Sequence, residues 1–465
     1  MDVLRYIWEL FDDRTGASEV WKRTAGHLVP PGTGWWYVFG SATLAAFIVQ
    51  VVTGIALASV YTPSTESAYS TLQFISQQAA WGHLLRGLHY FGASAMILLI
   101  GIHVSRTYLM GSYKYPRELN WLTGAVLLVL VVVMGFTGQL LRWDQIAVWS
   151  VYIAAEQAGR VPFVGKALAH FILAGDQVGG ATLTRFFAFH VFFIPALIFG
   201  FIGIHLYLVI RNGISEPPKP GRPVDTRTYR AWYEKMVKRE GHPFWPSAAW
   251  RDVTFGVGMI TVLVILAWFI GAPHLSRPPD PTILKAEPRP DWYLLWYYAL
   301  LALLPHGIEP YVMVLGPLGF GLLLILLPLL ANKGERSAWR RPWAIGVVIL
   351  FWTMIVTLWI QGKKAPWSPA FAAKPLPASV IRASSGPVYR GGQLFHSAGC
   401  EACHNIAGYG GHRGPDLTTV GDRLTGDEIT IRIVNGATNM PAFGGILSAK
   451  ELNDLVAFLK SRKTQ

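Results

Sequence analysis

The chain has 465 residues, of which 52% are hydrophobic and 14% are charged. This composition excludes an ordinary soluble protein, because it supplies far more apolar sequence than a soluble core needs, and it indicates a membrane protein. The formal net charge of +13 is gathered in alternate loops between apolar segments. That pattern is a topology signal and argues against nucleic acid as a partner.

The N-terminal segment, MDVLRYIWELFDDR, lacks the apolar run of a cleavable signal peptide and predicts an amphipathic helix in the membrane interface. Seven stretches of about 20 mostly apolar residues follow it, each long enough to cross roughly 30 Å of hydrocarbon as a helix. We therefore expect an all-α membrane protein with seven transmembrane helices. These lie near residues 35–60, 84–108, 121–141, 186–210, 253–271, 311–331 and 342–361.

The charged loops predict the orientation of the chain. Lys and Arg are concentrated in the N-terminal segment and in the loops after the second, fourth and sixth apolar stretches. Positively charged loops stay on the cytoplasmic side. We therefore expect a multi-pass protein of the bacterial inner (plasma) membrane, with its N-terminus in the cytoplasm and its C-terminal segment on the outer, periplasmic face.

Changes in composition divide the chain into a first apolar bundle, a second apolar region, a Pro- and Ala-rich linker and a small all-α domain. These parts are expected to cover residues 1–215, 216–362, 363–386 and 387–465. The last domain ends in the amphipathic segment LSAKELNDLVAFLKSRK, in which Ser448 and Glu451 have the spacing of a capping box. That spacing predicts the start of a terminal helix.

Four histidines lie in the second and fourth apolar stretches. His89 and His103 are 14 residues apart, and His190 and His205 are 15 apart. Such steps return to within about 40° and 60° of the starting helix face and advance about 21 Å along the axis. Because buried imidazoles need partners, we expect two bis-histidine sites that bind b-type hemes at two depths of a four-helix bundle. The alternative is four unrelated buried histidines.

Glycines repeat the histidine spacing on the first and third stretches. Gly40 and Gly54 are 14 residues apart, as are Gly124 and Gly138. Alone, small residues in membrane helices indicate helix packing. At these depths they are expected to let two porphyrins approach the backbone. Three arginines near the histidines are candidates for binding heme propionates, although helix-end arginines also serve as snorkelling anchors. They are Arg86, Arg106 and Arg185.

The C-terminal domain contains both cysteines of the chain, in the motif Cys400-Glu-Ala-Cys403-His404. This is the attachment motif of a c-type heme, in which two thioether bonds hold the porphyrin and the histidine binds iron. A structural or redox-active cysteine pair is the alternative, but the predicted outer location favours heme attachment.

The segments GLHYFGAS, HVSR and LTRFFAFH, together with the glycine pairs, resemble the cytochrome b family of quinol:cytochrome c oxidoreductases over about 330 residues. The resemblance implies that the His89/His190 heme lies near an outer quinol-oxidising site. It also implies that the His103/His205 heme lies near an inner quinone-reducing site.

The loop between the fifth and sixth stretches carries Pro290-Asp291-Trp292-Tyr293, which is similar to the Pro-Glu-Trp-Tyr motif of quinol oxidation in this family. The resemblance implies that Asp291 accepts a quinol proton and that Tyr293 supplies a hydroxyl. The chain departs from the family at Arg142, where proline is usual. A second pair, Arg251 and Asp252, resembles charges that the family uses near the inner quinone site. The alternative is that these two residues form the solvated start of a helix.

The helix count resembles the photosynthetic and Gram-positive branch, in which the b part and a three-helix subunit IV are often separate chains but are here fused. No cysteine is present for the extra covalent heme of that branch, so none is expected. Residues 387–465 resemble class I cytochrome c, which implies Met440 of Asn-Met-Pro as the second axial iron ligand.

The resemblance implies bifurcated quinol oxidation. One electron would go to a Rieske iron-sulfur protein, which must be a separate chain because no Rieske motif is present here. The second would cross two b hemes to reduce quinone, and heme c would pass electrons to a cytochrome c or another acceptor. A homodimer within a larger complex is also implied. The alternative functions are a diheme anchor that relays electrons without splitting them, and a histidine-lined channel that leaves the CxxCH motif unexplained.

Overall fold

The computed structural model describes residues 2–280, 289–305, 308–365, 367, 370, 372–436 and 440–464. Contacts divide the chain into two compact units. The first holds the long helices up to Val356, together with residues 288–294. The second holds α13 (Leu295–Leu303) and the chain from Thr357 to the C-terminus.

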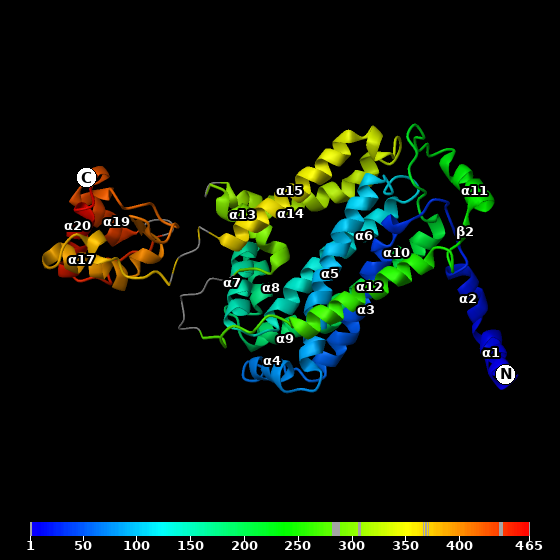
Figure 1. Ribbon diagram of the computed structural model, residues 1–465, viewed down its shortest axis with the longest axis horizontal. Helices are drawn as coiled ribbons and strands as arrows, with labels where there is room; N and C mark the ends of the chain where they lie inside the picture. The colour runs from blue at the N-terminus through cyan, green and yellow to red at the C-terminus, as the bar shows by residue number, and fades with distance from the viewer. Residues whose placement is uncertain are drawn as a thin grey trace. The chain divides into compact units, whose positions relative to one another are not determined.

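The seven predicted membrane spans are confirmed as long apolar helices among the described residues. They are α3 (Phe39–Ala58), α5 (Gly82–Leu109), α6 (Glu118–Leu140), the pair α9 and α10 (Gly180–Ala188 and Ile194–Asn212), α12 (Ala249–Phe269), α14 (Glu309–Leu330) and α15 (Pro342–Lys364). Helices α3, α5, α6, α10 and α12 run alongside one another as a bundle (Figure 1). Their meeting faces carry small and apolar buried residues such as Ala42, Ala46 and Ile198.

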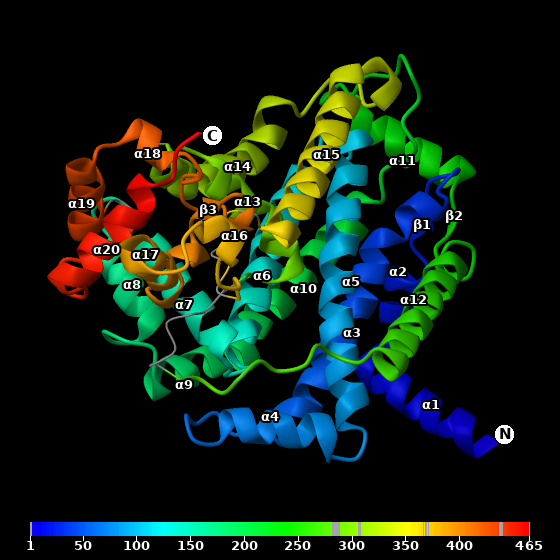
Figure 2. The same cartoon turned by 60° about the vertical axis from the view of Figure 1, so that its left-hand side comes forward.

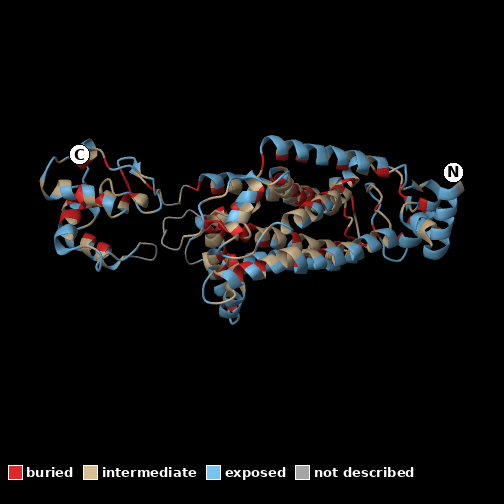
Figure 3. Ribbon diagram, turned by 90° about the horizontal axis from the view of Figure 1, so that it is seen from below, coloured by how far each residue is buried: buried red, intermediate tan, exposed pale blue. Residues whose placement is uncertain are grey.

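The outward faces of these helices are exposed (Figure 3), and many of the exposed side chains are large and apolar. Leu323, Leu330 and Leu350 of α14 and α15 are 68%, 80% and 70% exposed. Side chains of this kind stay in contact with water only at a cost, whereas lipid tails cover them readily. The chain is therefore a multi-pass membrane protein whose surface matches hydrocarbon.

The fourth span is not a continuous α-helix. A single π turn, Phe189–Phe193, joins α9 to α10 and contains His190. A π turn takes one residue more than an α turn. It therefore absorbs the additional residue in the 15-residue step from His190 to His205, so this step covers nearly the same rotation as the 14-residue step from His89 to His103 on α5.

Shorter helices, which hydropathy did not reveal, surround the ends of the bundle. In Figure 2, α4 lies across one end and α11 lies at the other. These and the remaining elements outside the last domain are α1 (Asp2–Thr15), α2 (Ala17–Thr24), β1 (Leu28–Val29), α4 (Ala68–Gln77), α7 (Gln145–Gly159), α8 (Gly165–Leu173), α11 (Tyr229–Glu240), β2 (His242–Pro243) and α13 (Leu295–Leu303).

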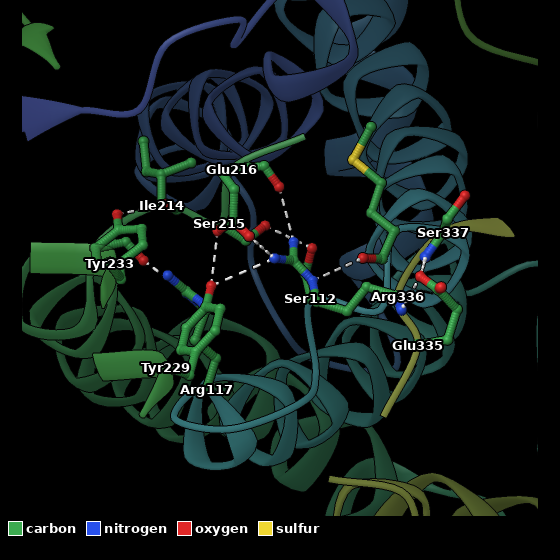
Figure 4. A network of polar contacts seen from close by, with 12 residues as sticks. Ser112, Arg117, Ile214, Ser215, Glu216, Tyr229, Tyr233, Glu335, Arg336 and Ser337 are labelled. Carbon is green, nitrogen blue, oxygen red and sulfur yellow. Dashed lines mark hydrogen bonds and ion pairs between the residues drawn. The ribbon is translucent and has the colours of Figure 1, made fainter. Parts of the chain in front are cut away.

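At the α11 end, buried cations cap the C-termini of three long helices. Lys114 donates to the carbonyls of Ala331 and Lys333 after α14. Arg117 donates to the Gly213 carbonyl after α10 and to the hydroxyl of Tyr229 (Figure 4). The last carbonyls of a helix have no partner within the helix and carry partial negative charge. These contacts therefore hold the two apolar regions of the chain together.

An ion pair completes this network. Arg336, from the loop before α15, pairs with Glu216 and also bonds Tyr229 (Figure 4). Arg341 donates to the carbonyls of Tyr108 and Leu109 at the end of α5. Arg336 and Arg341 are both buried, so their charges are balanced by these fixed partners rather than by water.

The last domain is a small helical fold around its own apolar core. Its elements are α16 (Ala378–Ile381), α17 (Gly386–Ser397), β3 (Asn405–Ile406), β4 (Tyr409–Gly410), α18 (Val420–Arg423), α19 (Gly426–Asn435) and α20 (Ala449–Lys460). Phe395 of α17 packs on Phe458 of α20 with ring centroids 5.8 Å apart. The predicted capping box of Ser448 and Glu451 is confirmed at the start of α20.

The segment expected to be a linker takes part in this domain. Leu376 and Ile381 are buried in its core, so the packed domain includes residues before 387. Four residues of the expected linker, 366, 368, 369 and 371, lie outside the described residues.

Candidate heme and quinol sites

His89 of α5 faces His190 of the π turn inside the bundle. Their ring centroids are 6.1 Å apart and the rings are inclined by 74°. A metal–imidazole bond is about 2 Å long, so two imidazoles that share one metal ion have centroids roughly 6 Å apart. The spacing of this pair therefore fits a bis-histidine heme iron. The second pair, His103 and His205, lies within electrostatic range of each other.

Each of the four glycines contacts one of these histidines across a helix interface. A Cβ atom on Gly54 would lie 3.2 Å from Cε1 of His89, and one on Gly138 would lie 2.6 Å from Cε1 of His190. The matching distances are 3.1 Å for Gly40 and His103, and 3.4 Å for Gly124 and His205. The two glycine repeats therefore make room for the imidazoles. The sequence predicted that they also let porphyrins approach the backbone, and this second role stays a prediction.

Three of the histidines are oriented by threonines that sequence analysis missed. Thr53, Thr123 and Thr137 place Oγ1 at 2.9, 2.9 and 3.2 Å from Nδ1 of His89, His205 and His190. Each threonine hydroxyl also lies within donating distance of a backbone carbonyl in its own helix.

A hydroxyl that donates to the backbone accepts from the ring. Nδ1 then carries the imidazole proton and Nε2 keeps a lone pair for iron. The repeated dipeptide Thr-Gly at 53–54, 123–124 and 137–138 was the signal that could have revealed these residues.

The three candidate propionate arginines differ in how they are paired. Arg106 is largely buried, stacks 3.8 Å above the Tyr37 ring, and has Nε and Nη2 without a hydrogen-bond partner in the described part of the chain. Arg86 donates to Ser76 at 3.0 Å and to the Pro273 carbonyl at 2.8 Å. Buried guanidinium N–H groups need acceptors. Arg106 is therefore the candidate that best fits a propionate.

Arg185 already has a partner in the chain. It donates to the Phe171 carbonyl at 2.5 Å and lies 5.3 Å from the centre of the Phe171 ring. At the start of α12, Asp252 accepts from Ser41 at 2.8 Å, and Arg251 reaches the Thr33 carbonyl at 3.4 Å. The expected inner-site pair is therefore tied to the start of α3 and to the segment before it.

The motif Pro290-Asp291-Trp292-Tyr293 folds against α5 and α6. Trp292 Nε1 donates to Ser94 Oγ of α5 at 3.0 Å. The hydroxyl of Tyr293 is buried without a hydrogen-bond partner among the described residues and lies beside Gly135 of α6, where a Cβ atom would be 2.5 Å away. A buried hydroxyl without a partner is a place where a ligand oxygen can bind.

Asp291 has an electrostatic setting suited to proton exchange. Burial raises the pKa of its carboxyl, the positive charge of Arg142 lowers this pKa, and the negative charge of Asp144 raises it. Burial also raises the pKa of Tyr293, so its phenol is protonated at neutral pH. The motif therefore presents one buried carboxyl group and one hydroxyl donor.

In the C-terminal domain, Cys400 begins a short 3₁₀ turn and His404 follows it. His404 Nδ1 lies 2.8 Å from the carbonyl of Pro415, and a Cβ atom on Gly414 would lie 2.5 Å from His404 Cε1. The carbonyl fixes the proton on Nδ1 and leaves Nε2 for iron. Burial raises the pKa of the Cys400 thiol to about 12.

Cys403 and Met440 complete the candidate residues of this domain. Burial also raises the pKa of the Cys403 thiol. Met440 is partly buried against the domain core, and its role as the second axial ligand stays a prediction. Asn439, which precedes it, lies outside the described residues.

Histidine pairs inside an apolar bundle, together with a CxxCH domain, define a membrane cytochrome that carries electrons. Residues 24–213 match the family described as Cytochrome b/b6/petB, and residues 278–380 match Cytochrome b(C-terminal)/b6/petD. Residues 387–459 match the family of cytochrome c oxidase, cbb3-type, subunit III.

Relatives agree with these matches. The cytochrome b6 of Synechococcus elongatus is 39% identical over 211 residues, which are 45% of this chain and 98% of that protein. The cytochrome b6 of Cyanidium caldarium is 40% identical over 212 residues, 46% of this chain and 98% of that protein. A solved structure titled "Hyperthermophilic respiratory Complex III" is 26% identical, with a TM-score of 0.66 over 76% of this chain and 91% of that one.

The chain belongs to the cytochrome b/b6 family, as a fusion of the b6-like part with the subunit IV-like part and a C-terminal cytochrome c domain. Membership implies b hemes, and the cytochrome c domain implies a covalent heme c at the CxxCH motif.

Proposed function

We propose that this chain is the cytochrome b subunit of a complex III-type quinol oxidoreductase that splits the two electrons of quinol at an outer site. His89/His190 and His103/His205 would bind the two b hemes, and Cys400, Cys403, His404 and Met440 would hold heme c. When bound, these groups carry one electron across the membrane and pass the other onward. The partners are a Rieske iron-sulfur protein, quinol and quinone, an acceptor cytochrome, and a second copy of the chain in a bacterial inner membrane.

One observation on α6 supports the outer quinol site most directly. Gly135 faces the Tyr293 hydroxyl, and Gly138, one helical turn further, faces the His190 ring. Tyr90, which follows His89, also lies within electrostatic range of Asp291. The PDWY motif and the outer histidine pair therefore share the same stretch of the bundle, as electron transfer from quinol to the outer heme requires.

The side chains of the motif divide the work of quinol oxidation. Oxidation of a quinol releases two electrons and two protons. The Tyr293 hydroxyl would hold one quinol oxygen, and the ionised Asp291 carboxylate would accept a proton from a quinol hydroxyl. The Trp292 hydrogen bond to Ser94 would keep both side chains in place against α5. Packing of the motif against α5 and α6 would limit the access of water.

Oxidant-induced reduction tests this function. Membranes containing the complex receive quinol, an inhibitor of the inner quinone site and a sudden oxidant, while the absorbance of the b and c hemes is followed. We expect the b hemes to become more reduced as heme c becomes oxidised, because electrons from one quinol separate. A D291N variant with full heme content should lose most of this response. Simultaneous oxidation of b and c hemes would instead show a linear electron conduit.

A further inference from the structure

Arg142 departs from the proline that is usual at this position, and the structure shows a defined place for its charge. It follows α6 and donates from Nη2 and Nε to Oδ2 of Asp144, at 2.6 and 3.2 Å. The Arg142 side chain is 26% exposed, whereas that of Asp144 is fully buried. A guanidinium that makes two bonds to a buried carboxylate has little freedom to move.

Asp144 is itself fixed on both oxygens. Its Oδ1 accepts from the Ala147 amide at 2.9 Å as the N-cap of α7, and its Oδ2 also accepts from the Ser276 amide at 3.0 Å. The neighbouring Gln145 donates from its backbone to the Arg277 carbonyl at 2.9 Å. The turn between α6 and α7 is thereby tied to the start of the loop that leads to the PDWY motif.

The charged and titratable groups that act on Asp291 come from three places. Arg142 and Asp144 lie on the turn between α6 and α7, Tyr90 lies on α5, and Tyr293 belongs to the motif itself. All four of these groups belong to the described part of the chain. Among them, Arg142 is the one that carries a positive charge. Burial of Asp291 opposes its ionised form, and a nearby fixed cation favours that form.

Resting on the proposed function, we infer that Arg142 is a positioning residue for quinol oxidation: anchored on Asp144, it supplies the fixed positive charge that the Asp291 carboxylate faces during proton transfer. The side chain of Asp291 is shorter than the glutamate that is usual at its position, and Arg142 stands where proline is usual. These two differences are then parts of one arrangement. Asp144 holds the guanidinium and prevents it from collapsing onto Asp291, so the carboxylate remains free to accept the proton.

This role predicts a direction for the pH dependence. Asp291 accepts a proton only when it is ionised. Without Arg142, burial and Asp144 act on its pKa without the opposing cation, so this pKa rises further. The acidic limb of the rate profile then moves to higher pH by about one unit, which is about a tenfold loss of rate on the acidic side. At alkaline pH the rate approaches that of the wild-type protein.

The test compares quinol-driven reduction of the b hemes across pH in membranes with the wild-type complex and with R142Q, R142K and R160Q. Arg160, near the end of α7, pairs with Glu156 and Glu309 and serves as the matched control. We expect a shifted acidic limb in R142Q, a profile close to wild type in R142K, and an unchanged profile in R160Q. Heme content is measured in each variant.

Infrared spectroscopy gives a second readout that does not depend on turnover. The protonated-carboxyl band that disappears in D291N is titrated in the wild-type protein, in R142Q and in R142K. We expect its midpoint to shift upward in R142Q and to stay within a few tenths of a pH unit in R142K.

An R142Q profile and carboxyl band that match wild type, with oxidant-induced reduction intact, would overturn the role of Arg142 and leave the proposed function standing. Loss of oxidant-induced reduction in the wild-type protein would overturn both.

Discussion

The hydroxyl of Thr53 on α3 lies 2.9 Å from Nδ1 of His89 on α5. Because this hydroxyl also donates to the Val49 carbonyl at 2.6 Å, it accepts a hydrogen bond from the ring Nδ1–H and fixes the tautomer that leaves Nε2 for iron. A ring that donates from Nδ1 is a more basic ligand, which stabilises the oxidised iron. With a heme bound at His89, the Thr-Gly pair would act on its electronic properties as well as on packing.

Replacing Thr53 with valine should raise the reduction potential of the outer b heme. The lost hydrogen bond is worth about 1 kcal/mol. Only the part of this energy that differs between oxidised and reduced heme moves the potential, so the shift is at most roughly 40 mV for one electron. A redox titration of the two b hemes measures this shift. T43V is the control, since Thr43 on the same helix bonds the Phe39 carbonyl. Equal potentials in T53V and the wild-type protein would contradict the assignment of the tautomer.

Replacing Gly138 with alanine should reduce the content of the outer b heme. The new Cβ atom would lie 2.6 Å from Cε1 of His190, so the ring or the helix must move. Gly200 on α10 has no neighbour within 4 Å of such a Cβ atom, so G200A is a matched control and gains helix propensity. We expect at least about half of the outer heme to be lost in G138A, by difference spectra per unit of protein. Full retention would show that helix packing alone explains this glycine.

The sequence was sufficient to predict the membrane architecture. Hydropathy located the second span near 84–108, and α5 covers Gly82–Leu109. This success has a physical cause, because the bilayer demands about 20 apolar residues whatever the tertiary structure. The capping box of Ser448 was predictable for a similar reason, since its hydrogen bonds are local.

Features that depend on neighbouring helices were not predictable in this way. Periodicity at 100° per residue treats α9 and α10 as one regular helix and does not include the π turn at His190. Helices α4, α7 and α8 have 10, 15 and 9 residues, so they are too short for a window of about 20 apolar residues to detect. From the sequence, Arg86, Arg106 and Arg185 were equal candidates for binding heme propionates. In the structure they differ in their partners, which are residues distant in the sequence, such as Pro273 and Tyr37.

Replacing Met440 with leucine should lower the reduction potential of heme c. A thioether ligand favours reduced iron, and a change of axial ligand moves potentials by on the order of 100 mV or more. M354L on α15 removes a thioether outside the C-terminal domain and is the control. Redox titration in the α band of heme c gives both values. A potential unaffected by M440L would assign the sixth ligand to another residue.

The buried Glu401, inside the CxxCH motif, should determine the stability of the c domain. It is 2% exposed and accepts from the Leu376 amide at 3.0 Å, and its other oxygen lies 2.7 Å from His396 Nδ1. E401A leaves that buried amide without an acceptor, which costs about 1–3 kcal/mol. We expect earlier thermal loss of the heme c spectrum in the full chain and faster proteolysis near Leu376. E401Q keeps an acceptor oxygen and should fall between E401A and wild type, whereas the exposed Asp427 should tolerate D427A. Equal stability of E401A and D427A would show that the segment before α17 is held by apolar packing alone.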